Sequence, residues 1–224
     1  GNRIEYNYWR DIGGSGGHGS CAIYFDDGDS GDTVFGNVFE NCGRTQLHYC
    51  NFGAVFSHAG CSNVVRNCLF VKCDRSLGGG PWPQEKWETR IKGRESVKWK
   101  NYDHKFKEEI DYRAPEWRMR YPELETFLDP YPEEIRKNAA YDCVAIDCPD
   151  RLYFPQKDGR VFSLGGYVRG HWYTNETFVA LKGDPGFVDY ARRDYRLRPD
   201  SEIYRRLPNF KPIPFDKIGL INRR

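Results

Sequence analysis

Carboxylate and imidazole side chains with a spacing suited to proton transfer occur in the first third of the sequence. Asp26 and Asp27 close a short apolar segment, and His58 closes a second segment of the same pattern. If the two segments are neighbouring strands, Asp26 and His58 lie one strand spacing, ~4.8 Å, apart on one face. A carboxylate and an imidazole at that separation can act as general acid and base. We therefore predict Asp26, Asp27 and His58 as catalytic residues, together with His18 in the preceding glycine-rich segment.

The same acidic segment supports three other interpretations. Two carboxylates on one face can divide the acid and nucleophile roles that cleave a glycosidic bond. Asp26, Asp27 and Asp29 could instead supply oxygen ligands to calcium, the one cofactor that these residues suggest. The run Asp-Asp-Gly-Asp-Ser-Gly is also typical of a tight turn, because Asp and Ser cap turns and Gly supplies positive φ.

Four further residues are predicted to bind a substrate, namely Tyr24, Arg75, Trp82 and Trp87. Aromatic rings offer a flat apolar face with a polar edge, and an arginine pairs well with a substrate carboxylate. The alternative is structural for each of them. The tryptophans could pack an insertion onto the rest of the fold, and an arginine that follows a strand could be solvated or pair with a turn.

A repeat of about thirty residues must position these side chains. Segments that end at Ile12, Cys42 and Cys73 align at offsets of 30 and 31 residues, and a later copy ends at Cys148. Self-similarity at this period indicates a solenoid whose turns stack to bury a shared core. The eight cysteines could form four disulfides in a secreted protein. The shared cysteine column favours reduced thiols instead, because parallel side chains in one column rarely present the torsion that a disulfide needs.

The fold class predicted from this repeat is all-β, a right-handed parallel β-helix solenoid with a partly helical insertion and a C-terminal cap. We divide the chain into stacked turns at 1–80, a Trp-rich insertion at 81–137, the final turns at 138–190 and a tail at 191–224 that caps the last turn. The first turn begins abruptly, which predicts missing N-terminal turns and self-association through an exposed strand edge.

Three sequence features carry a resemblance to a known group of proteins. They are Ile23-Tyr-Phe-Asp-Asp-Gly-Asp-Ser-Gly31, the Gly36-Asn-Val-Phe39 repeat and Asp194-Tyr-Arg-Leu-Arg-Pro-Asp-Ser201. Together they resemble the C-terminal portion of secreted bacterial right-handed parallel β-helix proteins of the pectin-lyase-like superfold, over nearly the whole chain.

This resemblance implies a secreted or periplasmic protein that acts on an extracellular polysaccharide as a glycoside hydrolase or a polysaccharide lyase. The alternative is a non-catalytic carbohydrate-binding or adhesive β-helix that uses aromatic stacking without an acid–base pair. Composition argues against two other classes of partner. A balance of 34 basic and 32 acidic residues lacks the basic excess of nucleic-acid binders, and no apolar run reaches the ~18 residues of a membrane span.

Overall fold

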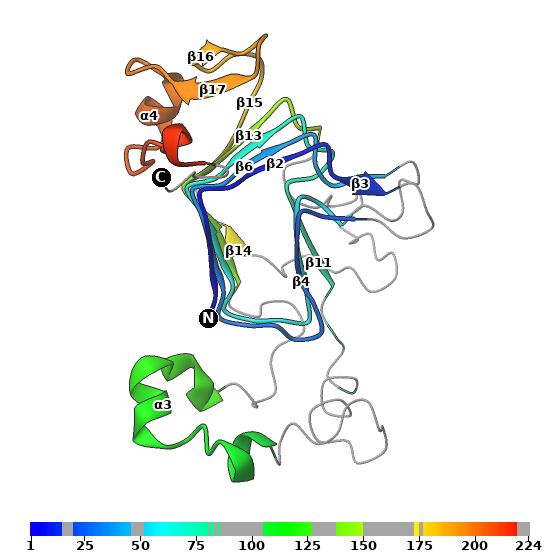
Figure 1. Cartoon of the computed structure of the whole chain (residues 1–224), viewed down its shortest axis with the longest axis vertical. Coiled ribbons are helices and arrows are strands. Elements are labelled where there is room, and N and C mark those ends of the chain that lie inside the picture. The colour runs from blue at the N-terminus through cyan, green and yellow to red at the C-terminus, as the bar shows by residue number, and fades with distance from the viewer. Residues whose placement is uncertain are drawn as a thin grey trace, which may run out of the picture.

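The computed structural model describes residues 1–14, 20–45, 52–80, 82, 85, 105–126, 138–149, 173–174 and 177–218. Over these residues the chain is predominantly β, with most strands in parallel sheets and a few short helices. In Figure 1 successive turns of the chain lie behind one another. The β content and the parallel pairing predicted from the repeat are confirmed.

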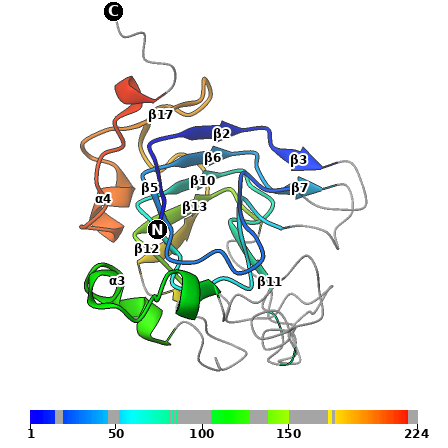
Figure 2. The same ribbon diagram turned by 60° about the horizontal axis from the view of Figure 1, so that its bottom comes forward.

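Two five-stranded parallel sheets make up most of the stack. The first has the order β1 (Arg3–Glu5), β5 (Thr33–Phe35), β9 (Val64–Arg66), β12 (Ala139–Tyr141) and β14 (Tyr173–Thr174). The second has the order β15 (Phe178–Leu181), β13 (Cys143–Ile146), β10 (Leu69–Val71), β6 (Val38–Glu40) and β2 (Tyr8–Arg10). Figure 2 shows β2, β6, β10 and β13 side by side in this order.

A third parallel sheet has three strands, and it carries the predicted catalytic residues. It consists of β4 (Ile23–Phe25), β8 (Val55–His58) and β11 (Leu77–Gly80), with β8 in the middle. Two smaller pairs complete the β structure. Short strands β3 (Gly13–Gly14) and β7 (Arg44–Thr45) pair in parallel, and β16 (Phe187–Asp189) pairs with β17 (Asp194–Leu197) in the antiparallel sense.

The interior of the stack contains the predicted columns of apolar side chains. Phe39 stacks on Phe70 with ring centroids 4.9 Å apart and nearly parallel planes. Trp9 continues this column in the turn before, 6.5 Å from Phe39. In the turn after, β13 places Ala145 opposite Phe70, and the ring of Phe178 on β15 lies 6.0 Å from that of Phe70. Because apolar side chains of successive turns stack in this way, each turn buries the apolar face of the turn beside it.

Corner residues repeat with the same period. Eight non-strand residues have φ between 50° and 64°, at two corners of each turn: Tyr6, Gly36, Asn67 and Asp142 at one, and Asp11, Asn41, Lys72 and Asp147 at the other. A ladder precedes the first sheet, in which the backbone N–H of one turn donates to a side-chain oxygen of the next. Its members are Asn2, Asp32, Asn63 and Asn138. Such ladders satisfy backbone groups that have no strand partner.

Cysteines form two interior columns, as the sequence predicts. Cys42, Cys73 and Cys148 share one, and Cys68 and Cys143 share the other. The seven described cysteines are thiols and not disulfides, in agreement with the prediction. Their sulfurs lie near carbonyl oxygens of the preceding turn, for example Cys73 Sγ at 3.4 Å from the oxygen of Phe39. Burial raises the pKa of Cys73 and Cys143 well above the ordinary value.

The C-terminal segment covers the outer face of the second sheet. Residues 187–218, which we call the cover, contain β16, β17, the short helix α4 (Glu202–Arg206) and the 3-10 turn η4 (Phe215–Lys217). Figure 1 shows the cover outside the stack, next to β15 and β13. Its apolar side chains pack on outward-facing residues of several successive turns, which include Val38, Leu69, Val71, Val144 and Ile146.

The position of the cover differs from the tail predicted over the last turn. The physical reason is the second sheet itself, whose strands β6, β10 and β13 are buried on both faces. A sheet that is apolar on its outer face must be covered along its length. The side chain of Asn67 ties the cover down, since it accepts from the backbone N–H of Lys211 and donates to the Lys211 carbonyl oxygen at 3.0 Å.

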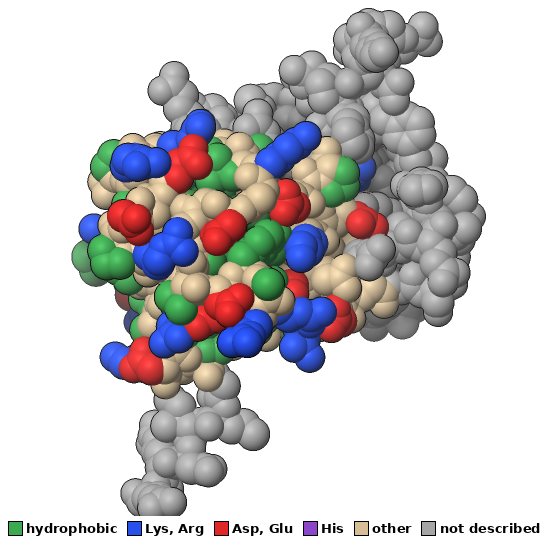
Figure 3. Space-filling view, turned by 90° about the horizontal axis from the view of Figure 1, so that it is seen from above, with side chains coloured by type: hydrophobic (Ala, Val, Ile, Leu, Met, Phe, Trp, Pro, Cys, Tyr) green, Lys and Arg blue, Asp and Glu red, His purple; other side chains and the backbone are tan. Residues whose placement is uncertain are grey.

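The surface of the cover is mixed in charge. Figure 3 looks onto this face and shows basic and acidic side chains interleaved around a small hydrophobic area. Such a mixed surface lacks the single-sign field that attracts a polyanion.

The described part of the insertion is partly helical, as predicted. It contains the π-helical turn η2 (Lys105–Glu109), helix α3 (Pro115–Arg120) and the 3-10 turn η3 (Pro122–Thr126). None of the helices in the described ranges has the length and apolar character needed to cross a membrane.

Candidate functional site

Strand register brings Asp26 and His58 together. β4 and β8 pair Tyr24 with Phe56 and Phe25 with Ser57, so the next residues along, Asp26 and His58, lie opposite each other. His58 Nδ1 is 2.9 Å from Asp26 Oδ1, a hydrogen-bond distance. The neighbouring turns therefore place the carboxylate and the imidazole as the aligned segments predict.

The acidic segment is a tight turn as well as a cluster. Asp27 and Gly28 both have positive φ, at 47° and 95°, and the backbone N–H of Asp29 donates to the carbonyl oxygen of Asp26 at 3.0 Å. Asp and Gly are the residues that tolerate this conformation. The turn points Asp27 back toward the ring, with its Oδ1 3.5 Å from His58 Nδ1. The tight turn and the cluster of acidic side chains are therefore both present, because the turn is what brings Asp27 close to His58.

Trp82 contacts the other ring nitrogen of His58. The Trp82 indole N–H donates to His58 Nε2 over 3.1 Å, and the two rings meet edge to face. Only 2% of the surface of Trp82 is exposed. The sequence predicts Trp82 as a substrate-binding residue, but in the structure its polar atom faces a protein side chain.

The electrostatic surroundings keep Asp26 ionised. Partial burial acts to raise the pKa of Asp26, but hydrogen bonds from His58 and Tyr24 outweigh it and hold the pKa below its ordinary value. The side chain of Asp26 remains 55% exposed, whereas that of Asp27 is 31% exposed. Asp26 is thus an ionised carboxylate that solvent, or a substrate, can reach.

Aromatic rings adjoin the carboxylates on the outer face of the third sheet. Tyr24 is 44% exposed and lies against Phe56 and Phe52, at 5.2 Å and 5.7 Å between ring centroids. Phe52 reaches this position because β11 has a glycine at Gly78, where a Cβ atom would lie 2.0 Å from the Phe52 carbonyl oxygen. Tyr24 therefore presents a flat aromatic surface next to Asp26.

The other predicted site residues lie elsewhere or outside the described residues. Arg75 precedes β11, five residues before Gly80, which pairs with His58. That position is toward the other end of the strand from the carboxylates. His18 and Trp87 fall outside the described residues.

Asp29 does not join Asp26 and Asp27. It lies past the turn, and its carboxyl group is hydrogen-bonded to Asp32. Burial, followed by the charge and the hydrogen bond of Asp32, raises the pKa of Asp29 to about 6. The three aspartates predicted as a calcium site are therefore not a single set of ligands, because the turn at Asp27 and Gly28 separates Asp29 from the other two.

One group of side chains in the described ranges has the geometry to hold a metal ion. It contains Asp26, Asp27 and His58, whose ligand atoms all lie within 4.8 Å of one another. A histidine nitrogen among the donors suits a transition metal better than calcium, which prefers an all-oxygen set.

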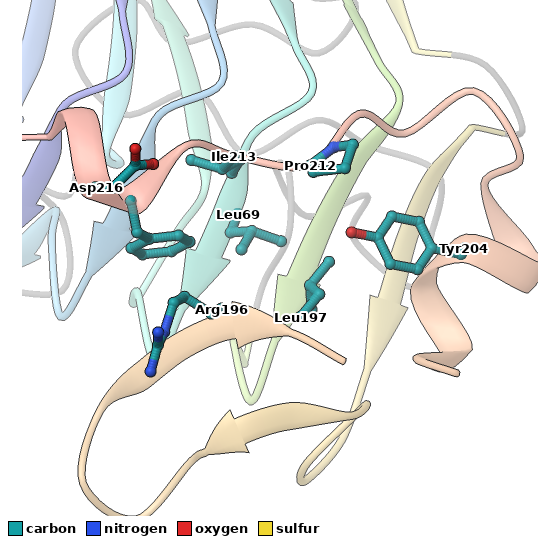
Figure 4. Close-up of a pocket in the computed structure, with 8 residues that line it drawn as sticks. Leu69, Arg196, Leu197, Tyr204, Pro212, Ile213 and Asp216 are labelled. Carbon is teal, nitrogen blue, oxygen red and sulfur yellow. The ribbon is translucent and has the colours of Figure 1, made fainter. Parts of the chain in front are cut away.

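A separate pocket lies between the cover and the second sheet. Its volume is about 510 Å³, and Figure 4 shows Leu69 and Ile213 beside it, with the Tyr204 hydroxyl directed inward. Arg196 at its edge is paired with Asp194. The pocket is lined mainly by apolar side chains, with Arg196, Tyr204 and Asp216 as its polar residues. Its lining includes no histidine, and therefore no carboxylate–imidazole pair like that of Asp26 and His58.

The bond between Trp82 and His58 is the part of the site that sequence reasoning missed. The sequence held no signal for it, because the Leu-Gly-Gly-Gly of β11 does not resemble the Val-Phe-Ser-His of β8, and only the strand register pairs Gly80 with His58.

Comparisons with protein-family models, with curated proteins and with solved structures find no match for this chain.

Proposed function

We propose that the chain is a right-handed parallel β-helix that acts on an extracellular polysaccharide as a glycoside hydrolase or a polysaccharide lyase. The observation that carries the proposal is the exposed, ionised carboxylate of Asp26 beside Asp27, held by His58 and Tyr24. The stack of parallel strands from successive turns of the chain supports the fold.

The two carboxylates suit either reaction. In hydrolysis one carboxyl group stays ionised as base or nucleophile and the other donates a proton to the leaving oxygen. The lowered pKa of Asp26 fits the ionised role, which assigns the donor role to Asp27. In β-elimination the same ionised Asp26 would abstract a proton from the sugar ring.

Tyr24 supports a sugar substrate. Its ring is exposed next to the carboxylates and is backed by Phe56 and Phe52. An aromatic ring in this position can stack against the apolar face of a sugar while its hydroxyl stays hydrogen-bonded to Asp26. With this substrate we propose a secreted or periplasmic location, the compartment in which such polymers occur.

A second candidate function is carbohydrate binding without catalysis. It is favoured by a specific observation, namely that both ring nitrogens of His58 are hydrogen-bonded to protein side chains. A histidine held in this way cannot take a proton from a substrate in this arrangement.

Self-association is a further proposal for the protein. Among the described residues, β1 and β2 are edge strands of their sheets, and an edge strand can pair with a strand of another chain. Sedimentation at high concentration tests it, and a strict monomer would count against association through this edge.

The test of the proposed function is a panel of acidic and neutral polysaccharides. Reducing ends report hydrolysis, and absorbance of unsaturated products reports elimination, each with and without calcium. Asp26→Asn and Asp27→Asn are expected to lower the rate at least about a hundredfold. Asp200→Asn, which alters an exposed carboxylate in the cover, is the matched control and should leave the rate unchanged. Binding without turnover would support the second candidate, and neither binding nor turnover would contradict both.

A further inference from the structure

We propose that Trp82 fixes His58 as its Nδ1–H tautomer, so that His58 is a positioning residue for Asp26, and Asp26 is the group that meets the substrate. The first half of this proposal stands on the hydrogen-bond geometry alone. The second half rests on the proposed function.

The tautomer follows from the kinds of atoms that meet. An indole N–H can only donate a hydrogen bond. Since the Trp82 indole nitrogen lies 3.1 Å from His58 Nε2, that ring nitrogen must accept and cannot carry a proton. The proton of a neutral imidazole is then on Nδ1, where it points at Asp26 Oδ1 over 2.9 Å.

The geometry disfavours the other two states of the ring. A proton on Nε2, in the second tautomer or in the imidazolium, would set two N–H donors against each other over 3.1 Å. It would also remove the acceptor that His58 Nε2 offers to the Trp82 N–H. Trp82 therefore selects one of the three states of His58.

This selection determines which group can react. Both ring nitrogens of His58 are used within the protein, one as donor and one as acceptor. Asp26 still has open acceptor positions, because its side chain is 55% exposed. His58 then has the role of an orienting residue, which fixes the direction of the carboxylate and stabilises its ionised form.

The same reasoning bears on metal binding. A metal ion at Asp26, Asp27 and His58 would need the lone pair of Nδ1, which the proposed tautomer uses for its proton. Metal binding would move the proton to Nε2 and break the bond from Trp82. Trp82 therefore acts against a transition-metal ion at these three side chains.

The first experiment measures the tautomer and needs no substrate. Long-range proton–nitrogen correlation spectra of the full chain, labelled with nitrogen-15, separate the two tautomers and the imidazolium. The His58→Gln variant identifies the His58 signals among the five histidines. We expect the Nδ1–H pattern at neutral pH. An Nε2–H pattern, an imidazolium pattern or a fast mixture of tautomers would overturn the proposal.

The second experiment changes the selecting residue. Trp82→Phe keeps a buried aromatic ring but removes the N–H, and we expect the His58 signals to move toward the Nε2–H tautomer. Zinc binding, measured by calorimetry with zinc alone, should then become about ten times tighter or more than in the unaltered protein. Equal zinc affinity in the two proteins would contradict the role of Trp82. If this variant does not fold, the spectrum of the unaltered protein still decides the tautomer.

The third experiment separates positioning from catalysis. The amide nitrogen of an asparagine occupies nearly the place of Nδ1 and donates in the same direction, but it cannot act as a base. On a substrate found in the panel, His58→Asn should keep the rate within about threefold, whereas His58→Ala should lose about tenfold to a hundredfold. Equal losses in both variants, with the acid limb of the pH–rate profile abolished in both, would make His58 a base and overturn this assignment. A tautomer as expected, with no turnover of any substrate, would contradict the proposed function and leave the first half of the proposal supported.

Discussion

Two carboxylates on the outer faces of neighbouring sheets illustrate what a cover does to an acidic side chain. Glu40 lies at the end of β6 in the second sheet, and Asp26 follows β4 in the third. Each carboxylate accepts a hydrogen bond from a tyrosine. Glu40 accepts from Tyr8 on the neighbouring strand β2, and Asp26 accepts from Tyr24 on β4. Glu40 is only 3% exposed, whereas the Asp26 side chain is 55% exposed.

The cover makes this difference. It adds Tyr195, whose hydroxyl donates to Glu40 at 2.8 Å, and Arg193, whose Nε lies 3.3 Å from the carboxylate. The Glu40 carboxylate is then bound by Tyr8, Tyr195 and Arg193 and is buried from solvent, so its role is to hold the cover on the sheet. Asp26 has no such cover among the described residues, and part of its binding capacity remains for another molecule. A carboxylate thus becomes structural or available according to what lies over it.

Among the variants that test this comparison, Glu40→Ala is expected to cause the largest loss of stability. Removal of this carboxylate leaves two hydroxyl groups and a guanidinium without their shared acceptor. We expect the free energy of unfolding in urea to fall by about 3 kcal/mol. A loss under about 1 kcal/mol would mean that the cover is held by its apolar contacts alone.

A smaller loss is expected from Asn67→Ala. This change removes the two hydrogen bonds to Lys211 and places alanine at a φ of 56°. We expect a loss of about 2 kcal/mol in urea unfolding, and about 1 kcal/mol for Asn67→Gly, which tolerates the same φ. Equal losses for the two variants would attribute the whole effect to the hydrogen bonds and none to the backbone.

Alkaline pH tests the tyrosines between the cover and the second sheet. Burial and the hydrogen bonds to Glu40 raise the pKa of Tyr8 and Tyr195 above the ordinary value of 10.0. Above pH 10 the unfolded chain loses these protons while the folded chain keeps them, so stability is full below pH 10 and declines as the pH rises further. Tyr195→Phe should flatten this decline in a thermal unfolding series. Tyr121→Phe, outside the cover, should leave its slope unchanged, and a flat profile in the unaltered protein would contradict the assignment.

The smallest effect on stability is expected from Asp26→Asn. The amide keeps the shape of the carboxylate, and the site is open to water. We expect urea unfolding to change by no more than about 0.5 kcal/mol, in the same variant that should lose at least about a hundredfold in rate. A stability loss as large as that of Glu40→Ala would show that Asp26 is also structural.

The repeat predicted the part of the site that depends on register. Offsets of 30 and 31 residues place Ile4, Val34 and Val65 in one column, and the structure pairs them. The match between the segments before Asp26 and His58 likewise predicted their contact. Period and register are properties of the local sequence, so they can be obtained without coordinates.

Contacts between segments of unlike sequence could not be obtained in this way. Trp82 reaches His58 from beyond the end of β11, and Asp29 turns away because Asp27 and Gly28 reverse the chain. The cover was misplaced because apolar residues on both faces of a strand do not say which segment lies outside. Leu69 faces the cover and Phe70 the interior, and in the sequence they are simply adjacent apolar residues.

The cysteine columns give the protein a set of internal reporters. Cys42, Cys73 and Cys148 belong to successive turns, and Cys42 and Cys73 are buried while Cys148 is partly buried. A thiol-reactive reagent can modify such a sulfur only when the turn that carries it opens. The order in which the sulfurs react, read by mass spectrometry, would therefore record the sequence in which the turns come apart, without the introduction of any label.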